Sequence, residues 1–181
     1  MRAKKKRPIF LSEGERSLFM ALLATALFGA GVALAIVMRF DDAALMGRQL
    51  SPYELWIVLS GAIGAASALY LLRSRIGQPH QDNPVRAALR FLTTTVLTSA
   101  LGAVIGGTMA LPLYGTMFGP FTLIVILAGS PFLLLLWCAN QFAAHKLLRT
   151  WHSERDSIFA QSAPIAPLMR RADRAGLIPR P

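Results

Sequence analysis

The histidines and the buried serines are the residues of this chain best suited to acid–base or nucleophilic chemistry. The candidates are His80, His145 and His152 in polar stretches, and Ser60, Ser99 and Ser130 inside long apolar segments. Nucleophilic catalysis needs a base within hydrogen-bond reach of the nucleophile, and serines placed so deep are not expected to meet the histidines. We expect the serines to serve helix packing, for which small polar residues are commonly used in membranes. We therefore predict no catalytic residues and no enzyme activity.

Metal binding is the second chemistry that the histidines suggest. His145 and His152 are seven residues apart and would share one face of a helix. Two imidazoles could bind a metal ion weakly, but no cysteine or carboxylate completes a ligand set of the usual kind. We expect surface histidines, with no metal and no cofactor. Asn140 and Gln141, close to the end of an apolar segment, are expected to form hydrogen bonds between helices or to meet lipid headgroups.

Ion-coupled transport requires ionisable groups within the membrane-length segments. No Asp, Glu, Lys, Arg or His lies between Phe91 and Ala144, and none lies in the middle of the earlier apolar segments. A small proton-coupled multidrug antiporter needs a buried carboxylate, and the sequence offers no candidate. This pattern argues against a proton-coupled transporter.

The bulk composition combines 54% hydrophobic residues with a formal net charge of +10. These properties conflict in a soluble protein but agree in a membrane protein with basic ends. A basic balance is also typical of proteins that bind nucleic acid. Because the cations here flank membrane-length apolar runs, we expect no nucleic-acid partner.

Four apolar segments have the length needed to cross a bilayer, and they span about 18–38, 53–72, 91–111 and 119–142. The predicted fold is an all-α membrane protein with four transmembrane helices. A basic arm (1–16) precedes the bundle (17–142), and a basic tail (143–181), partly helical and then disordered, follows it. The sequence Ala33-Leu34-Ala35 also has the form of a signal-peptide cleavage site. The length of the first segment and the three segments that follow it favour a retained helix.

Local signals place the starts of these helices. Two capping boxes, Ser12 with Glu15 and Ser51 with Glu54, predict helix starts near Glu13 and at Pro52. Asn83-Pro84 repeats the pattern of an N-cap followed by a first-position proline. Further along, Pro131 lacks the N–H that a continuous helix needs, so we predict a kink near Gly129 in the fourth segment.

Small residues recur at helical spacing in the apolar segments. Glycine lets two backbones approach closely because it carries no side chain. We predict that six glycines form helix-packing contacts, namely Gly29, Gly61, Gly64, Gly102, Gly106 and Gly107.

The distribution of Lys and Arg predicts the orientation. The arm, the three loops and the tail hold six, two, four, none and seven of them. By the positive-inside rule this alternation predicts that both termini are cytoplasmic, and we expect a bacterial cytoplasmic (inner) membrane. Six of these cations are predicted to contact anionic headgroups, namely Lys4, Lys5, Lys6, Arg7, Arg170 and Arg171. Their role in setting topology accounts for the same charges.

One family shows a partial resemblance. The order Arg39-Phe40, then 51–55, then Gly61-Ala62 is similar to the small four-span subunits of tripartite periplasmic transporters. The second half of the chain departs from that pattern, so no family is assigned.

The functional hypothesis is an accessory or scaffold protein that acts through helix–helix and headgroup contacts, without catalysis. Its partners would be the lipid bilayer and other membrane proteins or further copies of the chain. The alternative is a small membrane subunit of a transporter or channel, in which the Pro131 kink and the hydroxyl-rich stretch 93–99 line a path. A third possibility is a membrane enzyme or regulator with a site too diffuse to recognise.

Overall fold

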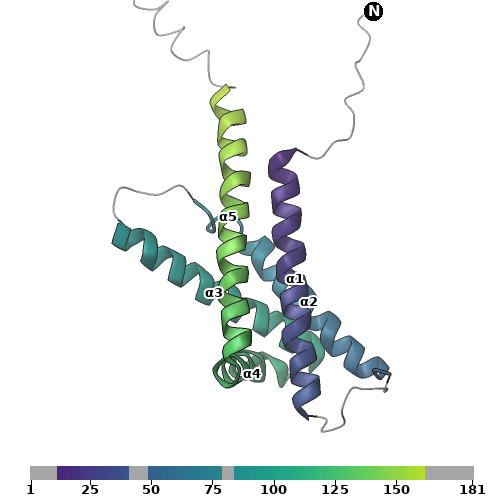
Figure 1. Cartoon of the computed structure of the whole chain (residues 1–181). Helices are drawn as coiled ribbons and strands as arrows, with labels where there is room; N and C mark the ends of the chain where they lie inside the picture. The colour runs from purple at the N-terminus through teal and green to yellow at the C-terminus, as the bar shows by residue number, and fades with distance from the viewer. Residues whose placement is uncertain (1–11, 41–48, 79–83, 162–181) are drawn as a thin grey trace, which may run out of the picture.

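The described part of the chain is entirely helical in its regular structure. The structure is a computed structural model, and it describes residues 12–40, 49–78 and 84–161. Its helices are α1 (Glu13–Phe40), α2 (Pro52–Leu72), α3 (Pro84–Ala110), α4 (Gly115–Gly129) and α5 (Pro131–Gln161) (Figure 1). No strand occurs within these ranges. The chain is therefore an all-α protein, as the sequence predicts.

The helices begin where the capping signals place them. Ser51 Oγ accepts a hydrogen bond from the Glu54 N–H at 3.3 Å, and the Glu54 carboxylate accepts from the Ser51 N–H at 2.6 Å. The same reciprocal pair joins Ser12 and Glu15, at 3.2 and 3.0 Å. Each box satisfies two N–H groups that the first helical turn leaves free. The α3 helix starts at Pro84 and continues without a break to Ala110.

Three helices are long and apolar enough to cross a membrane, and the pair α4 and α5 could form a fourth, broken span. The three are α1, α2 and α3. Most of their large apolar side chains are exposed on the outside of the bundle, as in Leu27, Leu71 and Val96. Lipid is the environment in which such a surface is stable, because it leaves no apolar area in water. The fold is that of an integral membrane protein.

The fourth apolar segment is not one kinked helix. The chain bends by 113° between α4 and α5, far more than a proline kink requires. Ser130 adopts an extended conformation and its Oγ accepts from the Leu133 N–H at 3.4 Å, while Pro131 occupies the first position of α5. Ser130-Pro131 is thus an N-cap and proline start, as at Ser51-Pro52. The expected kink is a helix end followed by a new helix.

The helix directions return the chain to the end where it began. Figure 1 shows α1 and α5 upright and side by side, with α2 and α3 crossing them obliquely. The α4 helix lies at the bottom and is viewed almost along its axis. We call the end where α1 begins and α5 finishes the terminal end, and the opposite end the loop end. At the loop end the Arg39 guanidinium lies 3.5 Å from the Gly129 carbonyl oxygen, beside the last turn of α4. A cation is favourable at such a helix C-terminus.

Glycine contacts hold the helices together in pairs. Gly29 of α1 packs against the backbone of Gly61 in α2, and Gly64 of α2 packs against Gly102 and Gly106 in α3. Between α3 and α4, Gly107 of α3 packs directly against the backbone of α4. All six glycines predicted to pack helices therefore lie at contacts within this one chain.

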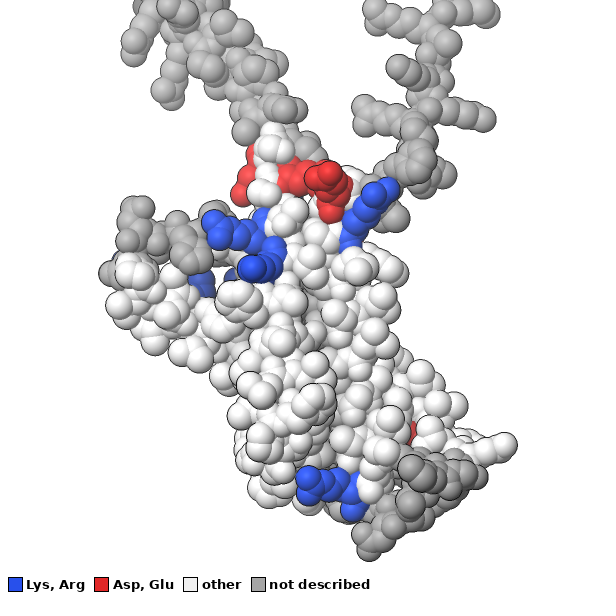
Figure 2. All heavy atoms as spheres, in the orientation of Figure 1, with Lys and Arg blue, Asp and Glu red and all other residues white. Residues whose placement is uncertain are grey.

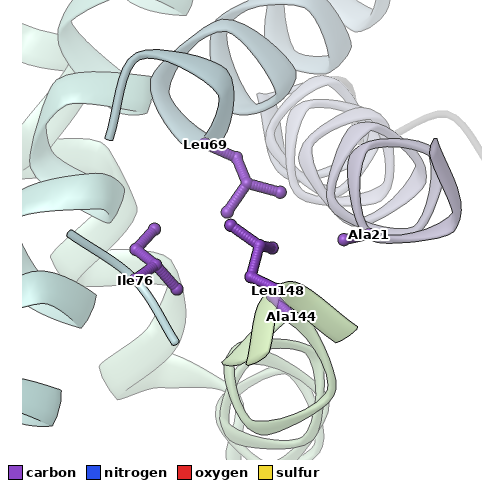
Figure 3. Packing of buried hydrophobic residues seen from close by; sticks show 5 residues of the cluster. All are labelled: Ala21, Leu69, Ile76, Ala144 and Leu148. Carbon is purple, nitrogen blue, oxygen red and sulfur yellow. The ribbon is translucent and has the colours of Figure 1, made fainter. Parts of the chain in front are cut away.

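An apolar core at the terminal end joins three parts of the chain. Leu69 of α2 and Leu148 of α5 point toward each other, with Ile76 from the turn after α2 beside them (Figure 3). Ala21 and Ala144 complete the cluster from α1 and α5. Leu148 is fully buried, so α5 is anchored here beyond the end of its apolar stretch.

Candidate functional site

A cavity lies at the centre of the bundle, where all five helices contribute to its wall. Its volume is about 140 Å³. A cavity of this size can hold one molecule about as large as benzene. Thr98 and Ser99, from the hydroxyl-rich stretch of α3, lie in its wall, and we describe it first as the candidate site.

Small residues create this space. Five of the six glycines predicted for helix packing line the cavity, namely Gly29, Gly61, Gly102, Gly106 and Gly107. The sixth, Gly64, faces the α2–α3 contact at Gly102 and Gly106. A glycine leaves both a close backbone approach and a void beside it, because no side chain fills the gap.

A hydrogen-bonded cluster forms the polar part of the wall. The Trp137 indole N–H donates to Ser99 Oγ at 3.0 Å, and the Gln141 side-chain amide donates to the same oxygen at 3.3 Å. The two donors come from α5 and the acceptor from α3, so the cluster bridges these helices across the cavity. Thr25 of α1 also lines the cavity, and its buried Oγ1 has no partner among the described residues. The site is therefore uncharged, mostly apolar and polar at one side.

Removing the Ser99 hydroxyl should destabilise the bundle. In Ser99→Ala the indole N–H and the amide of α5 lose their acceptor, and such unsatisfied buried donors cost about 1–3 kcal/mol. We expect a lower midpoint of thermal unfolding in mild detergent, followed by circular dichroism. Thr93→Ala is the matched control, because Thr93 is exposed and bonds only to carbonyls of its own helix. Equal midpoints for the two variants would contradict a bridging role for Ser99.

The other two predicted serines serve local helix structure. Ser60 is fully buried, and its hydroxyl donates to the Trp56 carbonyl one turn earlier at 2.8 Å. Ser130 caps the start of α5. Cys138 is exposed, and Asn140 has a buried side-chain nitrogen without a partner in the described chain. Ser60 and Ser130 therefore show packing and capping contacts.

His145 and His152 are half-buried and are not simple surface residues. The His145 ring packs against the Phe91 ring at a tilt of 51°, with centroids 4.4 Å apart, and its Nε2 lies 3.4 Å from Thr94 Oγ1. The Thr94 hydroxyl donates to the Arg90 carbonyl at 2.7 Å, so it has no proton to give to the imidazole. This contact therefore joins α5 to α3.

His152 stabilises the turn that follows α2. Its Nε2 lies 3.1 and 2.9 Å from the carbonyl oxygens of Arg73 and Ile76, which end the α2 helix and its following turn. A protonated Nε2 donates to both. His145 and His152 share one face of α5, as their seven-residue spacing predicts. Leu148 lies between them on this face and is fully buried. No group of metal-ligand residues occurs in the part of the chain that the structure describes.

The residues predicted to bind headgroups are outside the described ranges. Lys4, Lys5, Lys6, Arg7, Arg170 and Arg171, and likewise His80, lie in segments that the structure does not describe. Their predicted roles stay predictions.

Comparison with known proteins assigns no family to this helical architecture. No family model, no curated protein and no solved structure matches the chain.

Proposed function

We propose that this chain is a non-catalytic accessory or scaffold protein of a bacterial cytoplasmic membrane, and that it binds other membrane components. The observation that supports the proposal is a projection formed by two helix ends at the terminal end. The first turns of α1 and the last turns of α5 stand beyond the ends of α2 and α3 (Figure 1). We call residues 12–17 and 153–157 the terminal post.

The post includes the end of a long helix, and hydrogen bonds join its two parts. The 31 residues of α5 correspond to about 46 Å of helix, against about 30 Å for the hydrocarbon core of a bilayer. Its end is tied to α1, since Glu154 accepts hydrogen bonds from Ser12 Oγ at 3.2 Å and from the Gly14 N–H. Fixed, water-exposed helix ends lose little entropy when a partner binds, which favours a docking role.

Charge supports a cytoplasmic position for the post. Lys and Arg side chains gather near the terminal end, while Arg39 marks the loop end (Figure 2). Glu13, Glu15 and Asp156 add exposed acidic groups to the post. The positive-inside rule places the more cationic side in the cytoplasm. A partner would meet a surface of mixed charge on that side.

Site-specific photo-crosslinking in native membranes tests the proposal. A photoactivatable residue replaces Asp156 on the post, and a second variant carries it at Ile124, an exposed apolar position on α4. We expect a protein adduct of defined mass from the position on the post and only lipid adducts from α4. The absence of a protein adduct at Asp156 would refute docking through the post.

The central cavity favours a second function, that of a small subunit of a transporter or channel. Its polar cluster lies among apolar walls without charge, an arrangement suited to an uncharged solute. Glycerol entry into liposomes that contain the purified chain, measured by light scattering, tests this function. Entry faster than in protein-free liposomes, and altered in Ser99→Ala, would replace the accessory role with solute passage.

A further inference from the structure

A second hollow lies beside α3 and α5 at the terminal end, and five cations surround it. This basic cleft has a volume of about 690 Å³. The turn after α2, the first turns of α3 and the middle of α5 form its walls. Its cations are Arg75, Arg86, Arg90, Lys146 and Arg149. Figure 2 shows blue side chains gathered on this side of the terminal end, above a broad white surface.

The positive charge of the cleft is not neutralised within the described chain. No Asp or Glu described by the structure lines it, and none of the five cations forms an ion pair with a described residue. The interactions present are with neutral groups. Arg90 donates to the Gln78 side-chain oxygen at 3.2 Å, and the Lys146 ammonium lies 5.4 Å from the centre of the Phe142 ring. The only acidic residue of the neighbouring loop by sequence is Asp82, which lies outside the described ranges.

The start of α3 adds to this field. Pro84 and Arg86, in the first turn of α3, line the cleft. A helix N-terminus carries partial positive charge, which favours an anion. The five cationic side chains and the start of α3 therefore all attract an anion to the cleft.

Below the cations the wall becomes apolar. Phe91 and Phe142 meet edge to face with ring centroids 6.4 Å apart, and Leu92 lies beside them in the same wall. Leu92 and Phe142 are 56% and 58% exposed, so this surface is open to a ligand. Phe91 follows Arg90 directly, and from Phe91 onward α3 carries no charged residue. The boundary between cations and rings thus coincides with the level at which α3 enters the apolar region.

We propose that the basic cleft binds one anionic phospholipid. The phosphate lies among the arginines and Lys146, and an acyl chain lies along Phe91, Leu92 and Phe142. A soluble anion would use the cations alone, whereas a phospholipid uses both halves of the cleft. Basic hollows between helices at the cytoplasmic surface are suited to lipid headgroups on these physical grounds. The proposal requires a membrane-embedded chain but does not depend on the accessory role.

Native mass spectrometry of the full chain in mild detergent tests this site. The probes are dioleoyl phosphatidylglycerol, dioleoyl phosphatidylcholine and inorganic phosphate, each titrated separately. We expect the wild-type chain to retain one phosphatidylglycerol and to prefer it over phosphatidylcholine. In the double variant Arg86→Gln/Arg90→Gln we expect phosphatidylglycerol affinity to fall by about tenfold or more.

Two further variants test whether the loss of phosphatidylglycerol binding is specific to the cleft. Arg16→Gln/Arg155→Gln removes the same charge from the post, outside the cleft, and should retain phosphatidylglycerol within about twofold of the wild type. If the first double variant does not fold, Arg149→Gln removes a cleft cation from α5 and should weaken binding in the same direction. Equal binding by cleft and control variants would overturn the site. Inorganic phosphate binding as tight as that of phosphatidylglycerol would overturn the lipid as its occupant.

Discussion

Gly64→Ala should separate α2 from α3 and destabilise the bundle. A methyl group at this position would lie 2.5 Å from the Gly106 nitrogen and 2.6 Å from the Gly102 oxygen, both backbone atoms that cannot rotate away. The two helices must move apart, and overpacking of this kind typically costs about 1–3 kcal/mol. Thermal unfolding in mild detergent, followed by circular dichroism, should show a clear fall in the midpoint. Gly64→Leu should prevent assembly of the bundle.

Gly31→Ala is the control for this effect. Gly31 is also a helical glycine in an apolar segment, but no heavy atom lies within 4 Å of the position its methyl group would take. Alanine is a better helix former by up to about 1 kcal/mol, so this variant should unfold at or above the wild-type temperature. Similar losses in both variants would mean that glycine is required for helix flexibility and not for close approach.

Leu148→Ala should cost about 2–5 kcal/mol of stability, the usual range for a fully buried leucine. Leu148 has no exposed surface and packs against Leu69 and Ile76 (Figure 3). Truncation leaves a void that the surrounding helices cannot close without movement. Because this core joins α5 to the turn after α2, we also expect faster proteolysis of the terminal post.

Leu135→Ala provides the comparison on the same helix. Leu135 is 69% exposed and faces outward from the bundle. Its truncation creates no internal void and should change stability by less than about 0.5 kcal/mol. A loss at Leu135 as large as that at Leu148 would show that α5 has a buried partner face absent from the single chain.

The sequence predicts the helices well because their signals are local. A capping box uses residues three positions apart, so Ser12 with Glu15 and Ser51 with Glu54 can be recognised before any tertiary contact is known. Membrane length is equally local, since it depends only on a continuous apolar run. The same holds for the glycines, whose spacing in α3 indicates a face for close packing.

The break at Ser130-Pro131 is a feature that local sequence signals alone do not determine. An N-cap followed by proline predicts a helix start at Ser51-Pro52, but the same pattern inside a long apolar segment predicts only a kink. A kink and a new helix have the same local sequence cause, the missing N–H of proline. The close approach of α4 to α3 at Gly107 and the Arg39 contact at the end of α4 favour the sharp bend, and both are distant in sequence.

By itself the sequence determined an all-helical membrane chain, the starts of its helices and the glycines that allow close packing, because these properties depend on neighbouring residues. Only the tertiary structure decided how closely each glycine is packed, since a Cβ at Gly106 would lie 3.0 Å from the Ser60 oxygen whereas one at Gly64 would lie 2.5 Å from the Gly106 nitrogen. It also brought Ser99 to Trp137 and gathered the cations of three separate segments around one cleft. Such groupings depend on where helices cross, and crossing points are set by packing over the whole bundle.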